Sequence, residues 1–235
     1  MATLWLVATP IGNMEDITYR AIRILREADV LACEDTRQTV KILQRYEIQR
    51  EDKFIAYHEH NEERAGAALL ARLAHGNSVA LCSDGGMPGI SDPGYRLAYA
   101  AIEAGHTVEV IPGPSAVQTA LVVSGLPTSS YTFKGFPPKK SGARVRFLAE
   151  DGDRPHTLVV FESPYRIGAF LADALTALGD RRAAVCIELT KKFERVHRGY
   201  LAELAQEFGE TTPKGEITVV IAGNHPKFTR TITSA

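Results

Sequence analysis

The sequence has few of the residues that mark disulfide-bonded or metal-binding proteins, with three cysteines in 235 residues. Cys33, Cys82 and Cys186 lie far apart, each at the end of an apolar run. This spacing excludes a disulfide framework and a Cys-x-x-Cys metal knuckle, and it predicts reduced core residues. His58-Glu-His60 pairs two imidazoles without the remaining ligands of a metal site, so no metal is expected.

Several nucleotide-binding and hydrolase motifs are also absent. No Gly-x-Gly-x-x-Gly follows the first apolar run, which excludes the common dinucleotide-binding turn. The dipeptide Gly-Lys does not occur, which excludes the Walker phosphate loop. No Gly-x-Ser-x-Gly elbow exists, and Ser115 follows a proline in a pattern more typical of a helix start than of a nucleophile.

The charge balance lacks an excess of either sign, because 27 basic and 28 acidic residues leave a net charge of −1. A nucleic-acid partner would therefore need a local basic patch. With 45% hydrophobic residues the chain can bury a sizeable core. The opening apolar run is too short to span a membrane and meets Pro10 at once, so we expect no membrane partner and a cytoplasmic location.

The chain alternates apolar runs with amphipathic segments, which predicts an α/β fold in two domains. Five strands separated by helices predict a mostly parallel sheet in an N-terminal domain over 1–114. Strands with fewer helices between them predict a mixed sheet in a C-terminal domain over 115–225, followed by a loose tail over 226–235. Helices are expected from Asp16 to Ala28 and from Val145 to Glu150, among others.

Three of the predicted strands end in turns rich in glycine and proline. The longest of these turns is Ser83 to Gly94, and the others are Thr9-Pro-Ile-Gly-Asn13 and Pro112-Gly-Pro-Ser115. Bare backbone of this kind suits close approach to a ligand. Ligands of open α/β sheets sit outside the carboxyl ends of the strands, so the three turns predict one shared small-molecule cleft.

These turns and several further motifs resemble the ribosomal RNA small subunit methyltransferase I family, a branch of the tetrapyrrole methylase superfamily. The resemblance covers nearly the whole chain and includes Glu34-Asp-Thr-Arg37, His58-Glu-His-Asn-Glu62, Ser124-Gly-Leu-Pro127, Gly135-Phe-Pro-Pro-Lys139, Phe161-Glu-Ser-Pro164, Glu188-Leu-Thr-Lys191 and Lys214-Gly-Glu216. The chain departs from the family pattern at Gly85 and Met87, where alanine and threonine are usual, at Tyr165, where histidine is usual, and at Ile187, where arginine is common.

The resemblance implies a tetrapyrrole-methylase-like enzyme that holds S-adenosylmethionine between two domains. It implies 2′-O-methylation of a cytidine ribose in the decoding region of small-subunit (16S) rRNA, with that rRNA or the 30S subunit as partner. It also implies a homodimer and no metal. Two other functions stay open: methylation of a corrin-like macrocycle, and a non-catalytic role in RNA binding or assembly.

The methyl donor is a cation with an adenosine and an amino-acid tail, so its site needs backbone donors and a carboxylate. We predict Asp84 as that carboxylate, although a turn or helix cap would also explain an aspartate there. A core role is equally open for the two residues predicted to cover the adenine. The predicted wall of the site is Pro10, Gly85, Met87, Ser115 and Ala116, and the predicted adenine contacts are Phe161 and Leu189.

Methyl transfer to a ribose hydroxyl needs a base, because a neutral alcohol is a poor nucleophile. The candidates at strand ends are Glu34, Asp35, His58 and Asn61. We predict Asp35 as the base, with Arg37 holding a phosphate and Lys191 as a second polarising group. The alternative for Asp35 is a helix cap that pairs with Arg37.

RNA contact is predicted from the segment Thr128 to Ala149, which contains no acidic residue. Cations can pair with phosphates, and exposed aromatic rings can stack on bases. An ordinary solvated face, with some of the rings in the core, is the alternative. The predicted RNA-binding cations are Lys134, Lys139, Lys140, Arg144 and Arg146, and the interleaved rings are Tyr131, Phe133, Phe136 and Phe147.

Overall fold

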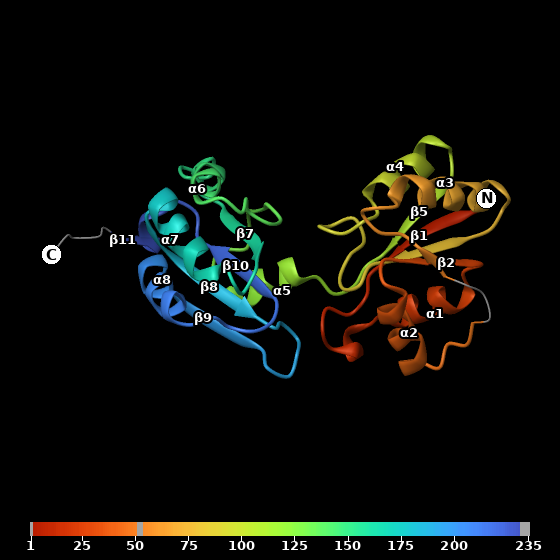
Figure 1. Cartoon of the computed structure of the whole chain (residues 1–235), viewed down its shortest axis with the longest axis horizontal. Coiled ribbons are helices and arrows are strands. Elements are labelled where there is room, and N and C mark those ends of the chain that lie inside the picture. Colours follow the sequence, from red (N-terminus) through yellow and green to blue (C-terminus); the bar gives the residue numbers. More distant parts are fainter. Residues whose placement is uncertain (1, 51–53, 231–235) are drawn as a thin grey trace. The chain divides into compact units, whose positions relative to one another are not determined.

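A computed structural model describes residues 2–50 and 54–230 of the chain. The chain divides into two compact units, Met1–Ser115 and Ala116–Ala235 (Figure 1). We call them the first and the second unit and describe each by itself. Both combine a sheet with helices, which confirms the predicted α/β class.

The first unit is built on a five-stranded sheet with the order β3-β2-β4-β1-β5, in which every neighbouring pair is parallel. The predicted parallel sheet is therefore confirmed. Because all five strands run the same way, their carboxyl ends lie along one edge of the sheet. The strands are β1 (Thr3–Val7), β2 (Val30–Cys33), β3 (Ile55–Ala56), β4 (Val79–Cys82) and β5 (Thr107–Ile111).

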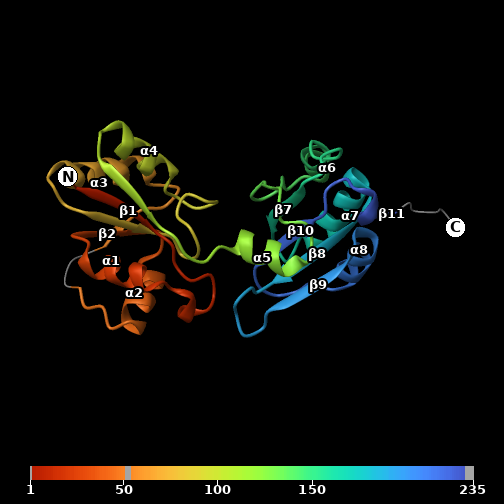
Figure 2. The same cartoon turned by 180° about the vertical axis from the view of Figure 1, so that it is seen from behind.

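Helices cover both faces of this sheet. α1 (Tyr19–Glu27) and α2 (Thr36–Arg45) lie on one face, and α3 (Glu62–Ala74) and α4 (Tyr95–Glu103) lie on the other (Figures 1 and 2). Side chains along β4 alternate between the two layers: Val79 and Leu81 join the core under α3 and α4, while Ala80 and Cys82 join the core under α1 and α2. A strand buried on both faces has to be apolar throughout, as β4 is.

The second unit contains a mixed sheet with the order β11-β8-β10-β7-β6, and β9 pairs with β8 off this path. β6 and β7 are parallel, whereas the other pairs are antiparallel. The predicted mixed sheet is thus confirmed. The strands are β6 (Tyr131–Phe133), β7 (Thr157–Glu162), β8 (Asp180–Ile187), β9 (Arg195–Tyr200), β10 (Ile217–Ile221) and β11 (Thr229–Arg230).

One face of this second sheet buries the core of the unit. Leu148, Phe170 and Leu204 belong to this core together with alternate residues of β7, β8 and β10. They come from α6 (Ser141–Ala149), α7 (Ile167–Leu178) and α8 (Leu201–Glu210). The remaining helix, α5 (Ala116–Ser124), contacts β7, β8 and β10 through residues outside that core, so it covers the other face.

Some element boundaries differ from the expectation. Asp16 lies in a short 3-10 helix, η1 (Met14–Asp16), and α1 begins later because the Thr18 hydroxyl accepts a hydrogen bond from Ala21 N at 3.0 Å. α6 begins at Ser141, four residues before the expected start. The three cysteines are free and buried, as predicted.

The expected loose tail is partly ordered. Residues 226–228 form a 3-10 helix, η2 (Pro226–Phe228), and β11 pairs with the start of β8. The Arg230 guanidinium bonds the buried carboxylate of Asp180 and lies 2.8 Å from Glu203. A two-residue strand has no periodic signal in the sequence, so only tertiary pairing reveals it. Residues 231–235 of the predicted tail lie outside the described residues.

Two glycines in the helical layer of the second unit give a test of its packing. A Cβ added at Gly168 in α7 would lie 2.5 Å from Phe208 O, whereas a Cβ at Gly209 in α8 would meet nothing within 4 Å. We expect Gly168→Ala to lower the free energy of unfolding by about 1 to 3 kcal/mol through overpacking. Gly209→Ala should raise it by about 0.5 to 1 kcal/mol, because alanine favours helix.

Chemical denaturation of the two variants and the parent chain measures both effects. Equal shifts of the same sign would contradict the close approach of α7 and α8.

Candidate functional site

The loops that follow β1 and β4 pair with each other at the carboxyl edge of the first sheet. Thr9 and Gly86 exchange two backbone hydrogen bonds of 2.9 Å each. The buried Thr9 hydroxyl also donates to Ser83 O at 3.0 Å. These hydrogen bonds hold the two loops together. The turns after β1 and β4 therefore lie side by side in the first unit, as predicted.

Glycines allow these loops to approach closely. Gly86 has a φ of +87°, which favours glycine, and a Cβ at Gly85 would lie 3.3 Å from Pro10 O. The loop after β5 joins them, because a Cβ at Gly113 would lie 2.8 Å from the Cβ of Ala8. Any side chain at Gly113 would push the loops apart. The loops at the carboxyl edge of the first sheet therefore expose backbone peptide groups that no Cβ covers.

Three carboxylates gather where β2 and β4 end. Glu34 and Asp35 follow β2, and Asp84 follows β4. The Asp84 carboxylate accepts a hydrogen bond from Asp35 N at 2.9 Å. This hydrogen bond connects the end of β2 to the end of β4.

The three carboxyl groups differ in pKa. Burial raises the pKa of Glu34, and the charge of Asp84 raises it further. Burial likewise raises the pKa of Asp84, with the charge of Asp35 adding to it. Asp35 is the opposite case, since hydrogen bonds from Arg37 lower its pKa to about 2. Two adjacent carboxyl groups with raised pKa values form a place that attracts a cation.

Asp35 serves as the N-cap of α2. Its carboxylate accepts from Arg37 N at 2.8 Å and binds the Arg37 guanidinium at 2.6 Å. This is the alternative that the sequence left open for Asp35. A carboxylate with a pKa of about 2 is a weak base, and Glu34 next to it has the more suitable raised pKa. In the sequence, Glu34 was a candidate base because it directly follows a predicted strand. Asp35 has the same position, so the sequence could not distinguish the two.

The loop after β3 contributes His58 and Asn61 beside this cluster. The Asn61 side chain accepts from His58 N at 2.8 Å and donates to Ala56 O at 2.9 Å, which holds the turn before α3. His58 is close enough to Glu34 to interact with it electrostatically. An open hollow of about 880 Å³ lies here, lined by residues 58–64 with Ala67 and Arg96. Its lining does not include the predicted donor-site residues.

The described part of the chain, 2–50 and 54–230, contains no group of three or more side chains that could hold a metal ion. Within these same residues no helix combines the length and apolarity that crossing a membrane requires.

In the second unit, Phe161 is the next-to-last residue of β7 and lies in a cluster of rings. Its ring centroid lies 4.9 Å from that of Phe133 and 5.5 Å from that of Phe136. Leu189 is buried after the end of β8. Their contact with adenine stays a prediction. Ser115 is the last residue of the first unit and Ala116 begins α5, while Met87 lies half-buried in the loop after β4.

Lys191 lies in an ion-pair cluster of the second unit. Its Nζ is 2.8 Å from Glu188 and 3.0 Å from Glu216. Burial alone would lower the pKa of Lys191, but hydrogen bonds to these carboxylates outweigh burial and raise the pKa, so the side chain stays a cation. The Glu188 carboxylate also accepts from Glu216 N at 3.0 Å, which fastens the loop to the start of β10. Lys191 is thus held within the fold.

Two of the five cations predicted to contact RNA are internal. Lys134 Nζ binds Phe147 O, Glu150 and Asp151 at 2.6 to 2.8 Å. Arg144 is 3% exposed and pairs with Asp173. Their carboxylate partners, Glu150, Asp151 and Asp173, lie outside the acid-free segment, and the contact of these two cations with RNA stays a prediction. Lys139, Lys140 and Arg146 are exposed.

Comparison with known proteins gives the family. The family model "Tetrapyrrole (Corrin/Porphyrin) Methylases" matches residues 3–205. A protein of Halalkalibacterium halodurans named ribosomal RNA small subunit methyltransferase I is 49% identical over 96% of this chain and 77% of its own length. A protein of the same name from Mesorhizobium japonicum is 50% identical over 93% of this chain and 74% of its own length.

Solved structures agree in fold. A conserved hypothetical protein from Aeropyrum pernix K1 superposes with a TM-score of 0.74 at 19% identity, covering 96% of this chain and 86% of its own. Uroporphyrin-III C-methyltransferase from Thermus thermophilus, complexed with S-adenosylhomocysteine, superposes with a TM-score of 0.66 at 20% identity. The match covers 94% of this chain and 97% of the Thermus chain. By sequence identity and family model together, the chain belongs to the ribosomal RNA small subunit methyltransferase I family of tetrapyrrole methylases.

Proposed function

We propose that this chain transfers the methyl group of S-adenosylmethionine to small-subunit rRNA, at the ribose 2′-oxygen of a cytidine in the decoding region. The observation that carries the proposal is identity of about one half, over nearly the whole chain, with relatives named for this rRNA. The Thermus neighbour with S-adenosylhomocysteine supports the choice of donor. The 30S subunit as partner and a homodimer, both implied by the family resemblance, are part of the proposal.

The residues at the carboxyl edge of the first unit fit the donor. The glycine-floored loops offer backbone groups that no Cβ covers. Asp84 and Glu34 offer negative charge, which suits a sulfonium and an amino group. When bound, the donor supplies an activated methyl group. Pro10, Gly85 and Met87 would hold it from the loops after β1 and β4, with Ser115 and Ala116 at the start of α5.

Glu34 is the better candidate for the base that takes the ribose hydroxyl proton. It lies half-buried at the edge where Asp84 follows the neighbouring strand, and its raised pKa is closer to neutrality. Asp35 orders the start of α2 and fixes Arg37, which remains free to contact a phosphate through the rest of its exposed guanidinium. Lys191, held by Glu188 and Glu216 in the second unit, is the proposed second polarising group.

A second function, methylation of a corrin-like macrocycle, is favoured by the description of the matched family model. Transfer of tritium from labelled S-adenosylmethionine to 30S subunits, to 16S rRNA and to uroporphyrinogen III separates the two. The proposal expects label in rRNA and a new ribose-methylated cytidine in the mapped product. Label in the macrocycle alone would overturn it, and no label in any acceptor would favour a non-catalytic role.

Glu34→Gln tests the base. We expect kcat for rRNA methylation to fall by about 10² to 10⁴, because the proton acceptor is removed while the shape of the side chain is kept. Donor affinity, measured by calorimetry, should fall much less than kcat, because Asp84 keeps its negative charge. Asp35→Asn is the matched control, because asparagine also caps helices and the effect on kcat should be small. A larger decrease for Asp35→Asn than for Glu34→Gln would restore Asp35 as the base.

The pH dependence of kcat gives a second test. A base works when deprotonated, so kcat should rise as pH increases through the raised pKa of Glu34. Asp84→Asn removes a negative charge that raises this pKa, so the acid limb of the kcat profile should move to lower pH. The measurement is made at saturating donor. An unmoved or upward-shifted limb would contradict the coupling of Glu34 and Asp84.

Charge reversal tests the exposed cations of the basic segment. We expect the double change Lys139→Glu and Lys140→Glu to weaken RNA binding about tenfold or more. The slope of log K against log salt should become shallower by about 0.7 for each phosphate that is no longer neutralised. Lys227→Glu, an exposed cation in η2, is the control. A decrease in log K for the control that is half as large as for the double variant would mean that overall charge alone governs binding, because the control changes half as much charge.

A further inference from the structure

Exposed aromatic rings gather at one edge of the second unit's sheet. β6 and β7 are parallel, and β8 runs the same way because β10 is antiparallel to both β7 and β8. The carboxyl ends of β6, β7 and β8 therefore share an edge. Phe136 follows β6 and is 60% exposed, Tyr165 follows β7 and is 88% exposed, and Phe193 follows β8 and is 70% exposed. We call these three residues the aromatic edge.

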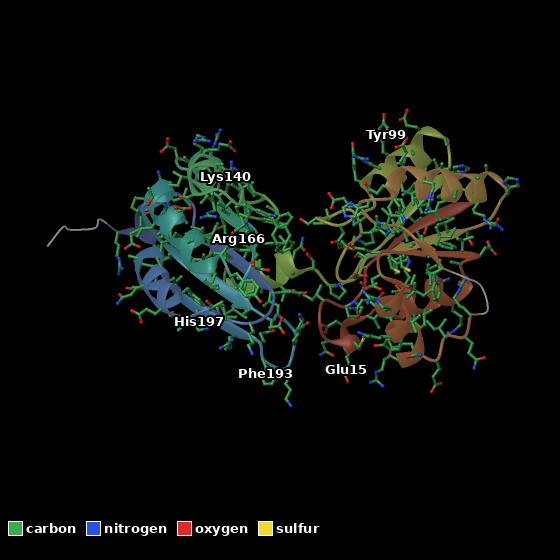
Figure 3. All side chains as sticks on the ribbon, viewed as in Figure 1. Glu15, Tyr99, Lys140, Arg166, Phe193 and His197 are labelled. Atoms are coloured by element: carbon green, nitrogen blue, oxygen red, sulfur yellow. The ribbon has the colours of Figure 1, made fainter. Side chains whose placement is uncertain are left out.

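Each ring is presented by a locally fixed turn. Phe136 packs one side against Phe161. The turn that carries Tyr165 is fixed by the buried Glu162 carboxylate. This carboxylate accepts a hydrogen bond from Ser163 N at 2.6 Å and pairs with Arg166 at 2.5 Å. Figure 3 shows Arg166 within the unit and Phe193 at the loop between β8 and β9.

The loop of Phe193 is ordered by its polar neighbours. The Glu194 carboxylate accepts from Thr190 N at 2.5 Å, and Glu194 N donates to Lys191 O at 3.0 Å. Lys191 in turn is tied to Glu188 and Glu216. These bonds are made within the loop and to β10, so the Phe193 ring is left on the outside. Ordered exposed rings lose little conformational entropy when a ligand stacks on them.

Several basic residues lie in the loops at this edge. The acidic residues in the same loops are engaged, since Glu188 and Glu216 bind Lys191 and Glu194 binds Thr190 N. The Lys192 ammonium lies 5.7 Å from the centroid of the Phe193 ring. Within residues 2–50 and 54–230, no carboxylate lies within 4.0 Å of the charged groups of the exposed cations here, which are Lys139, Lys140, Lys192, Arg195 and Lys214.

We propose that the aromatic edge of the second unit binds unpaired nucleotides of the RNA substrate, with bases stacked on Phe136, Tyr165 and Phe193 and phosphates paired with the neighbouring cations. The inference rests on the proposed function and specifies that the bound part of the RNA is single-stranded. Three strand spacings, roughly 14 Å in all, separate the strand ends of β6 and β8 from which these loops start.

Single-stranded RNA fits this edge better than a duplex. Bases within an A-form helix are stacked on each other, whereas those of loops and single strands expose their faces to aromatic side chains. Stacking tolerates any base, since each has a π-face. The edge thus supplies affinity for an opened RNA segment, while recognition of the target nucleotide falls to other groups.

The test uses the full chain and a fluorescein-labelled single-stranded RNA of about twelve nucleotides, alone or annealed to its complement. Fluorescence anisotropy should show tighter binding of the single strand. Tyr165→Ala and Phe193→Ala should each weaken that binding about tenfold, which is typical of removing one ring from beneath a stacked base. Tyr165→Phe should retain it. Tyr99→Ala is the matched control, because Tyr99 is an exposed ring on α4 of the first unit and belongs to none of the predicted binding segments.

Binding within twofold of the parent for both alanine variants, or equal affinity for duplex and single strand, would overturn the inference. Donor binding, measured by calorimetry, shows that the variants are folded. Methylation of 30S subunits by the parent chain is measured in parallel. Methylation together with unaffected RNA binding of the variants overturns the aromatic edge alone, whereas absent methylation overturns the proposed function and leaves the stacking result to stand by itself.

Discussion

Parallel pairing in the first unit is the constraint on which its site depends. Five parallel strands end at one edge, so loops that are far apart in the sequence become neighbours. Thr9 and Gly86 then complete the arrangement by exchanging backbone hydrogen bonds, and Gly113 lets the loop after β5 touch Ala8. The chemistry at this edge is therefore a consequence of strand direction, and a register or topology change would disperse it.

The same edge separates the roles of similar side chains. Glu34 and Asp35 are adjacent in sequence, yet Asp35 caps α2 and is held ionised by Arg37 while burial raises the pKa of Glu34. Local hydrogen bonding and burial thus give two adjacent carboxyl groups pKa values on opposite sides of the usual range. The second unit shows a parallel case, because Lys134 is bound by Glu150 and Asp151 whereas Lys139 is exposed.

The sequence predicted much of the architecture and less of the site. The parallel sheet of the first unit and the mixed sheet of the second unit were both predicted, because apolar runs alternate with amphipathic segments along the sequence. β11 was missed because two residues carry no period. The buried role of Arg144 was missed because Asp173, its partner, comes from α7, 29 residues later. Such pairings depend on tertiary packing, which local composition does not encode.

The central claim is that the loops after β1, β4 and β5 hold the methyl donor. The direct measurement is a backbone amide NMR titration of the ¹⁵N-labelled chain with S-adenosylhomocysteine. The account predicts saturable shifts at Gly85, Gly86 and Ser115. Shifts confined to the hollow lined by residues 58–64, or no shift at millimolar ligand, would contradict it.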